Sequence, residues 1–235
     1  MSNHFLIPFT ERKSSGPSKT NFLWKLENLY VMDNHRLAAW CWAQEIPSAD
    51  HTLQHLLHMD AHYDCDPRAL KEWIESGRVL KNLTIKDYLD LKNSEGQPMI
   101  LWDNYLPIFF HDYQKMLGKK VAVTHRMGIK GEFDLELETF DFLKPIDDLL
   151  LFQKPWIVNV DIDYFFPRHD KEHTFIHPET IRKFFRLLKL NYDEGHISVL
   201  TVCLSPECCG GWTQAESVLK IFEEEFKLPN ILPPL

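Results

Sequence analysis

Short, continuously apolar segments separated by amphipathic ones constrain the fold of this 235-residue chain most strongly. Four such segments are predicted as strands, at residues 56–60, 121–125, 156–162 and 197–205. Parallel strands that are covered on both faces have this continuous pattern, whereas half-exposed antiparallel strands alternate polar and apolar residues. Segments with helical spacing are found at 35–45, 67–77, 84–92, 104–117, 178–190 and 212–226. The alternation predicts a three-layer α/β/α fold with a mainly parallel sheet.

The length and the hydrophobic fraction of 44% favour a single domain over residues 1–235. Within it, residues 11–20 (ERKSSGPSKT) are expected to form a flexible segment, and the proline-rich residues 228–235 an extended tail. No apolar run approaches the roughly 18–20 residues of a membrane helix, so no membrane partner is expected. The first residues also lack the pattern of a secretory signal.

The charge balance indicates which partners this chain is suited to bind. Its formal net charge is -8, which argues against a nucleic-acid partner and permits a cationic substrate. The five cysteines form no C-x-x-C pair and are odd in number. A reducing, cytoplasmic location is therefore expected. A homo-oligomer is compatible with the sequence.

Two acidic clusters follow predicted core strands. The first is DAHYD, with Asp60, His62 and Asp64, and the second is VDIDYFFP, with Asp161 and Asp163. Open parallel sheets place ligand sites at the carboxyl ends of their strands. Because a strand repeats every two residues, Asp60 and His62 are expected on one face, as are Asp161 and Asp163. Buried carboxylates are costly unless they are paired or bind cations, so the clusters indicate a cation site.

The order of these motifs resembles the arginase and agmatinase superfamily of ureohydrolases. His35 in MDNHRLAAW precedes the first cluster, and Glu207 in SPE follows the last predicted strand, as in that family. The segments DNHRLAAW, HMDAHYD and SPECCGG resemble in particular a divergent branch of the superfamily. Some bacterial members of that branch are peptide arginases, which convert arginine side chains of ribosomally made peptides to ornithine. The resemblance implies an arginase/deacetylase-like fold.

The resemblance also implies a mechanism. Two Mn²⁺ ions per chain would be bridged by Asp60 and Asp161, and oxygen-rich ligation suits this hard ion. The remaining ligands would be His35 and Asp64 for one ion, and His62 and Asp163 for the other. Glu207 would bind the guanidinium and stabilise the tetrahedral intermediate that leads to urea and ornithine. A histidine between the two clusters would shuttle the proton, and we prefer His125 to His111 because it follows a predicted strand.

The sequence departs from arginases that act on free arginine. After DAHYD it reads CDPRALKEW, without the Asn and Ser residues that hold the α-amino and α-carboxylate groups in that family. This absence favours arginine within a precursor peptide as the substrate. Two alternatives remain open: a zinc-dependent, deacetylase-like amidohydrolase of the same fold, and a non-catalytic peptide-binding module.

Three further residues lie near the motifs. His58 is expected either to orient a metal ligand or to be a hydrogen-bonded core histidine. Cys208 and Cys209 can line the pocket, but no ligand role is expected for them, because the metal cluster of the family contains no sulfur.

Overall fold

The computed structural model describes residues 4–47, 53–138, 141–144, 146, 155–166 and 173–234. Within these ranges the strands form one sheet in the order β1-β2-β3-β8-β7-β4-β5-β6. The strands are β1 (Phe5–Ile7), β2 (Leu23–Leu26), β3 (Leu29–Met32), β4 (Gln54–His62), β5 (Leu117–Met127), β6 (Leu135–Leu137), β7 (Trp156–Asp161) and β8 (Ile197–Cys203). The pairs β1–β2 and β2–β3 are antiparallel, and every pair from β3 to β6 is parallel. The predicted mainly parallel sheet is confirmed.

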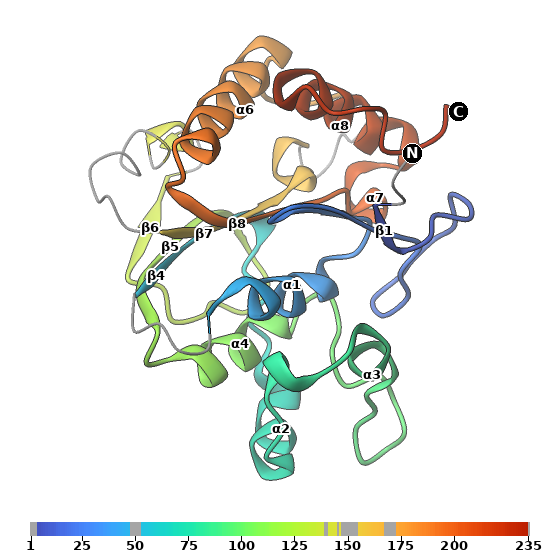
Figure 1. Cartoon of the computed structure of the whole chain (residues 1–235), viewed down its shortest axis with the longest axis vertical. Coiled ribbons are helices and arrows are strands. Elements are labelled where there is room, and N and C mark those ends of the chain that lie inside the picture. Colours follow the sequence, from blue (N-terminus) through green and yellow to red (C-terminus); the bar gives the residue numbers. More distant parts are fainter. Residues whose placement is uncertain are drawn as a thin grey trace.

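Helices cover both faces of this sheet (Figure 1). One face carries α6 (Pro178–Asp193) and α8 (Trp212–Phe226), and the other carries α1 (Ala38–Glu45) and α4 (Tyr105–Tyr113). Farther out on the second side lie α2 (Leu70–Ser76) and α3 (Ile85–Asp90), and the four-residue α7 (Pro206–Cys209) follows β8. The predicted helices are all found, and the three-layer arrangement is confirmed.

Several element boundaries differ from the prediction; for example, β4 and β5 extend beyond the predicted ranges 56–60 and 121–125 at both ends. The helix predicted over 104–117 ends at Tyr113, because β5 already begins at Leu117. The strand predicted over 156–162 ends at Asp161, whose side chain caps the 3-10 helix η5 (Ile162–Phe165) by accepting the N–H of Asp163 at 3.0 Å. The strand predicted over 197–205 ends at Cys203.

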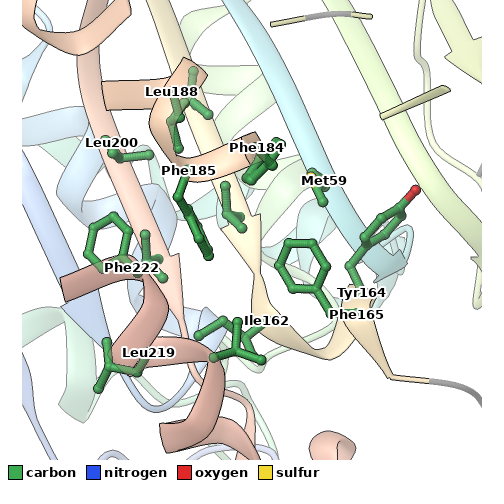
Figure 2. Packing of buried hydrophobic residues seen from close by; sticks show 14 of the residues in the cluster. Met59, Ile162, Tyr164, Phe165, Phe184, Phe185, Leu188, Leu200, Leu219 and Phe222 are labelled. Atoms are coloured by element: carbon green, nitrogen blue, oxygen red, sulfur yellow. The ribbon is translucent and has the colours of Figure 1, made fainter. Parts of the chain in front are cut away.

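Apolar side chains fill the space between the sheet and each helical layer. Figure 2 shows the layer under α6 and α8, where Phe184, Phe185 and Phe222 pack against Leu200 of β8 and Met59 of β4. These residues are all fully or almost fully buried. Burial of a large side chain contributes roughly 1.5–3 kcal/mol, so this layer is a main source of stability.

The central strands present different chemistry to the two layers. On β4, Leu57 and Met59 face the α6/α8 layer, whereas Leu56 belongs to the apolar cluster on the α1/α4 side. Since side chains alternate along a strand, His58 and Asp60 face the α1/α4 side with Leu56. The sheet therefore directs its buried polar residues toward one layer, near α1.

The segments predicted to be flexible and extended make specific contacts. Arg12 forms an ion pair with Glu216 of α8 at 2.6 Å, and Ser15 is only 2% exposed. Residues 228–234 have no helix or strand, and Ile231 is buried, with its N–H donated to Glu223. No helix in the described part of the chain is both long and apolar enough to cross a bilayer.

Candidate metal centre

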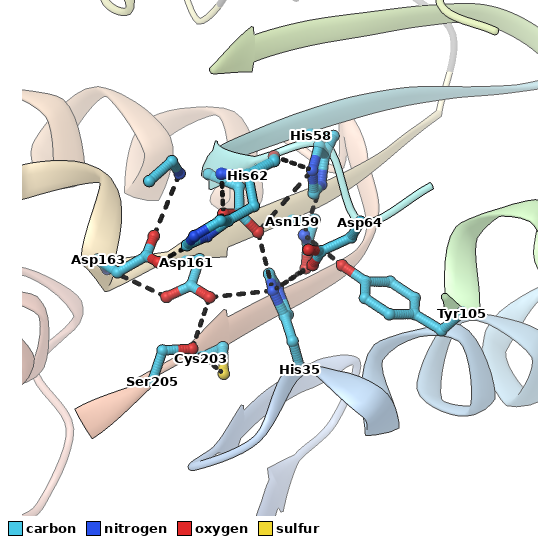
Figure 3. Close-up of polar contacts among 12 residues, drawn as sticks. His35, His58, His62, Asp64, Tyr105, Asn159, Asp161, Asp163, Cys203 and Ser205 are labelled. Atoms are coloured by element: carbon cyan, nitrogen blue, oxygen red, sulfur yellow. Dashed lines mark hydrogen bonds and ion pairs between the residues drawn. The ribbon is translucent and has the colours of Figure 1, made fainter. Parts of the chain in front are cut away.

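Six residues predicted from the sequence converge at the carboxyl end of the sheet (Figure 3). Asp60 lies near the end of β4 and Asp161 at the end of the neighbouring strand β7. His35 begins the 3-10 helix η1 (His35–Leu37), which follows β3. The full set, called the six-residue cluster below, is His35, Asp60, His62, Asp64, Asp161 and Asp163.

Local backbone geometry brings the outlying members of the cluster inward. Asp64 has φ of 51°, a left-handed conformation that few residues other than glycine adopt. Asp163 was expected on an extension of β7 but lies in the first turn of η5, two residues after the strand ends. The turn nevertheless carries its carboxylate back to β4, where Oδ1 accepts the N–H of Ala61 at 3.1 Å.

One histidine nitrogen faces three carboxylates. The Nδ1 atom of His35 lies 2.9 Å from Asp60 Oδ2, 3.2 Å from Asp64 Oδ2 and 3.0 Å from Asp161 Oδ2. A ring nitrogen carries at most one hydrogen, so it cannot satisfy three acceptors. Such a convergence of donor atoms is the arrangement expected of a cation site.

Two carboxylate oxygens in the cluster have no well-aligned hydrogen-bond donor and face histidine nitrogens. Asp60 Oδ2 and Asp163 Oδ2 are buried and lack a well-oriented donor. Histidine nitrogens lie 2.9 and 3.0 Å from them, respectively. Buried polar atoms in native proteins are nearly always satisfied, so these oxygens call for a partner that the polypeptide does not supply. A divalent cation would be a suitable partner for these oxygens. Carboxylate and imidazole ligands suit a hard ion such as Mn²⁺.

The buried carboxylates repel one another. Burial, and then the charge of Asp60, raise the pKa of Asp64 well above its usual range. Burial and the charges of Asp161 and Asp60 raise the pKa of Asp163 to about 7. Burial disfavours charge on His35, but Asp161, Cys203 and Asp60 together outweigh it and raise the pKa of His35 well above its usual value. Divalent cations would relieve this repulsion by replacing protons as the balancing charge.

Asn159 on β7 fixes the orientation of two histidines and was not among the site residues predicted from the sequence. Its Oδ1 lies 3.0 Å from His35 Nε2 and also accepts the hydroxyl hydrogen of Thr201 at 2.8 Å. Because this oxygen can only accept, His35 Nε2 carries a hydrogen and Nδ1 is the atom directed at the carboxylates. A polar residue within the apolar run WIVNVD was the available signal.

His58 is the second histidine held by Asn159. The amide Nδ2 donates to His58 Nδ1 at 2.9 Å, and His58 Nε2 donates to the carbonyl of His62 at 3.1 Å. Burial lowers the pKa of His58 to about 4, so its ring is neutral at pH 7. Of the two roles expected for His58, the structure shows a hydrogen-bonded core histidine that also supports the backbone at His62.

Ser205 connects β8 to the cluster. It has φ of 39°, and its hydroxyl donates to Asp161 Oδ2 at 2.6 Å. A left-handed conformation at a residue with a Cβ costs of the order of 1–3 kcal/mol and persists only where its surroundings hold it in place. This turn also sets the direction of α7.

Glu207 lies on α7, but its carboxylate points to the N-terminal segment. It accepts the N–H of Ser15 at 2.5 Å, the hydroxyl of Ser15 at 3.0 Å and the N–H of Gly16 at 3.3 Å. The same segment is held by Asn34, whose amide donates to the carbonyl of Gly16 at 2.7 Å. The substrate-binding role of Glu207 stays a prediction, and it requires the carboxylate to leave these partners.

The two candidate proton shuttles lie in different surroundings. The ring of His125 on β5 is 4.8 Å from that of Tyr164 and 5.2 Å from that of Phe175, and burial lowers its pKa. His111 is exposed on α4. Neither lines the cavity at the cluster. A shuttle role for His125 stays a prediction.

A cavity of about 250 Å³ opens onto the cluster. A second cavity, of about 590 Å³, shares Cys65 and Ile129 with it. The residues that line the first cavity are His35, His62, Asp64, Cys65, Asp66, Trp102, Asp103, Gly128, Ile129, Asp161, Asp163, Ser205 and Cys208. Five of these described residues are aspartates, and none is a lysine or an arginine.

Comparisons with known proteins add little to this geometry. No family model and no curated protein matches the sequence. Among solved structures, proclavaminate amidino hydrolase from Streptomyces clavuligerus is similar, with 16% identity and a TM-score of 0.49. The similarity covers 85% of this chain and 61% of that chain. A similarity with this identity and this TM-score does not establish a family.

Proposed function

We propose that this chain is a dinuclear metal hydrolase that cleaves the guanidinium group of arginine to ornithine and urea. The observation that carries the proposal is the convergence of four aspartates and two histidines, with two buried carboxylate oxygens that lack well-aligned hydrogen-bond donors. Four carboxylates balance the charge of two divalent ions. A single zinc ion held by two aspartates and a histidine would leave Asp64 and Asp163 without a function, so a dinuclear site is favoured over the deacetylase-like alternative.

The resemblance noted in the sequence suggests Mn²⁺, and the six-residue cluster, Asp60 and Asp161 included, would hold the ions. When bound, two neighbouring divalent ions lower the pKa of water and supply a nucleophile at neutral pH. The chain itself contributes the acidic cavity, which attracts a guanidinium cation and holds it near the cluster. Trp102, on the cavity wall, offers an aromatic face on which a guanidinium can stack.

We further propose that the arginine belongs to a peptide. Free arginine has an α-carboxylate, and the described lining of the cavity contains no lysine or arginine to bind it. Arg68, nearby, is already paired with Asp66 at 2.7 Å and with Asp103 at 2.5 Å. The adjoining second cavity offers space for residues on either side of the arginine.

The test is mass spectrometry of arginine-containing peptides incubated with the protein and Mn²⁺, together with a urea assay. We expect each modified arginine to lose the mass of a CN₂H₂ unit and to release one urea. The Asp161→Ala variant should release no measurable urea, because it lacks the carboxylate that faces both His35 and Ser205. Undiminished turnover by this variant would contradict the assignment. Metal analysis should find two manganese ions per chain, whereas one zinc ion would favour the deacetylase-like alternative.

A further inference from the structure

Cys208 is a potential metal ligand on the cavity wall that the proposed function does not use. It lies on α7 and lines the same cavity as the six-residue cluster. Its sulfur, a nitrogen of His62 and a carboxylate oxygen of Asp163 all lie within 4.8 Å of one another. Asp163 is only 3% exposed, and its Oδ2 atom is one of the two buried oxygens without a well-aligned hydrogen-bond donor.

The fold directs Cys208 toward the cluster. The left-handed turn at Ser205 begins α7, and the N–H of Cys208 donates to the carbonyl of Ser205 at 2.8 Å. The side chain of Ser205 is in turn bonded to Asp161. The position of the thiol is therefore coupled to a residue of the cluster through two short hydrogen bonds.

The separations suit one ion bound by three donors. In a tetrahedral zinc site, nitrogen and oxygen ligands lie roughly 2.0 Å and sulfur about 2.3 Å from the ion, so two donors are roughly 3.3–3.5 Å apart. Atoms that already lie within 4.8 Å of one another need to approach by at most about 1.5 Å.

We infer that Cys208, together with His62 and Asp163, is a ligand of one of the two metal ions. This inference rests on the proposed dinuclear centre and refines it. The thiol proton passes to solvent as the sulfur–metal bond forms, and no oxidation state changes. The half of the centre beside His62 then has a higher relative affinity for softer cations, such as Zn²⁺ or Co²⁺, than the half beside His35 and Asp64, although both halves can still take up Mn²⁺. This replaces the expectation, drawn from the family resemblance, that sulfur has no part in the centre.

Two other cysteines provide matched controls. Cys203 also lies within ligand distance of a histidine and an aspartate, His35 and Asp161, but it is fully buried and does not line the cavity. Cys65 lines the cavity, but it belongs to no group of three potential ligands among the described residues.

The test is titration of the chelator-treated full chain with Co²⁺, followed by absorption spectroscopy. We expect a sulfur-to-cobalt charge-transfer band in the near ultraviolet that saturates with one equivalent of Co²⁺. Cys208→Ser should lose the band, and Cys203→Ser and Cys65→Ser should keep it. Circular dichroism confirms folding, and Cys208→Ala provides a second variant. Bound Co²⁺ without the band, or a band that persists in Cys208→Ser, would overturn the inference.

The same samples separate this inference from the proposed function. Urea release by the Mn²⁺-loaded protein, without a charge-transfer band for Co²⁺, would refute the sulfur ligand and leave the proposed hydrolase intact. A band that depends on Cys208, without urea release from any arginine-containing peptide, would support the sulfur ligand and refute the hydrolase.

Discussion

Replacement of Asn159 by leucine tests whether the hydrogen bonds behind the cluster determine metal binding. The leucine removes the acceptor 3.0 Å from His35 Nε2 and the donor 2.9 Å from His58 Nδ1, and both histidines are buried. Each unsatisfied buried group costs about 1–3 kcal/mol, so the free energy of unfolding should fall by roughly 2–6 kcal/mol. Loss of the partner that orients a metal-binding histidine also lowers metal affinity by about 10- to 100-fold.

Urea denaturation of the metal-free protein measures the first effect, and isothermal titration calorimetry with Mn²⁺ measures the second. Asn159→Asp keeps a hydrogen-bond acceptor for His35 and should therefore retain more of the Mn²⁺ affinity than Asn159→Leu does. Thr201→Val is the matched control, because Thr201 bonds Asn159 but does not touch His35. It should lower stability by about 1 kcal/mol and leave Mn²⁺ affinity nearly unchanged. The reasoning is refuted if Asn159→Leu lowers stability and still binds Mn²⁺ as tightly as the wild type.

Two further predictions concern His58 and Glu207. The pKa of His58 falls from about 6.5 in the unfolded chain to about 4 in the folded protein, so its contribution to stability is complete above pH 6.5 and is lost as the pH falls toward 4. Across this pH range, the free energy of unfolding measured by urea denaturation should fall by up to about 3 kcal/mol more for the wild type than for His58→Gln. If the free energy of unfolding depended on pH in the same way for both proteins, the pKa shift would be contradicted. Glu207→Ala removes charge-assisted hydrogen bonds to Ser15, each of which contributes about 1.5–3 kcal/mol, so trypsin should cut at Lys13 or Lys19 at least about 10-fold faster. Equal cleavage rates in the two proteins would show that this carboxylate does not hold the segment.

The sequence predicted the central strands and most of the cluster because both depend on local patterns. The apolar runs of β4 and β7 each end at an aspartate, and neighbouring parallel strands bring their carboxyl ends together. The argument from strand periodicity was wrong for Asp163, because the chain turns into a 3-10 helix directly after Asp161. The carboxylate still reaches the cluster, since one helical turn returns the backbone toward β4.

Features that depend on distant parts of the chain could not be predicted. The strands β2 and β3 have four residues each, too few for a periodic pattern to be distinguished. Ser15 meets Glu207 across 192 positions of sequence, and no local rule relates the two. Asn159 lies in an apolar run, and its importance emerges only when His35 and His58 are seen on either side of it.

The order of the strands has a consequence for how the chain assembles during synthesis. β7 and β8 are made last among the strands, yet they lie in the middle of the sheet, between β3 and β4. Before they emerge from the ribosome, β3 lacks its neighbour β8 and β4 lacks its neighbour β7, and unpaired strand edges favour aggregation. The addition of β7 and β8 joins β3, and with it His35, to the part of the sheet that carries Asp60. A nascent chain that stops short of β7 lacks both the strand that joins β4 to β8 and two aspartates of the six-residue cluster, Asp161 and Asp163.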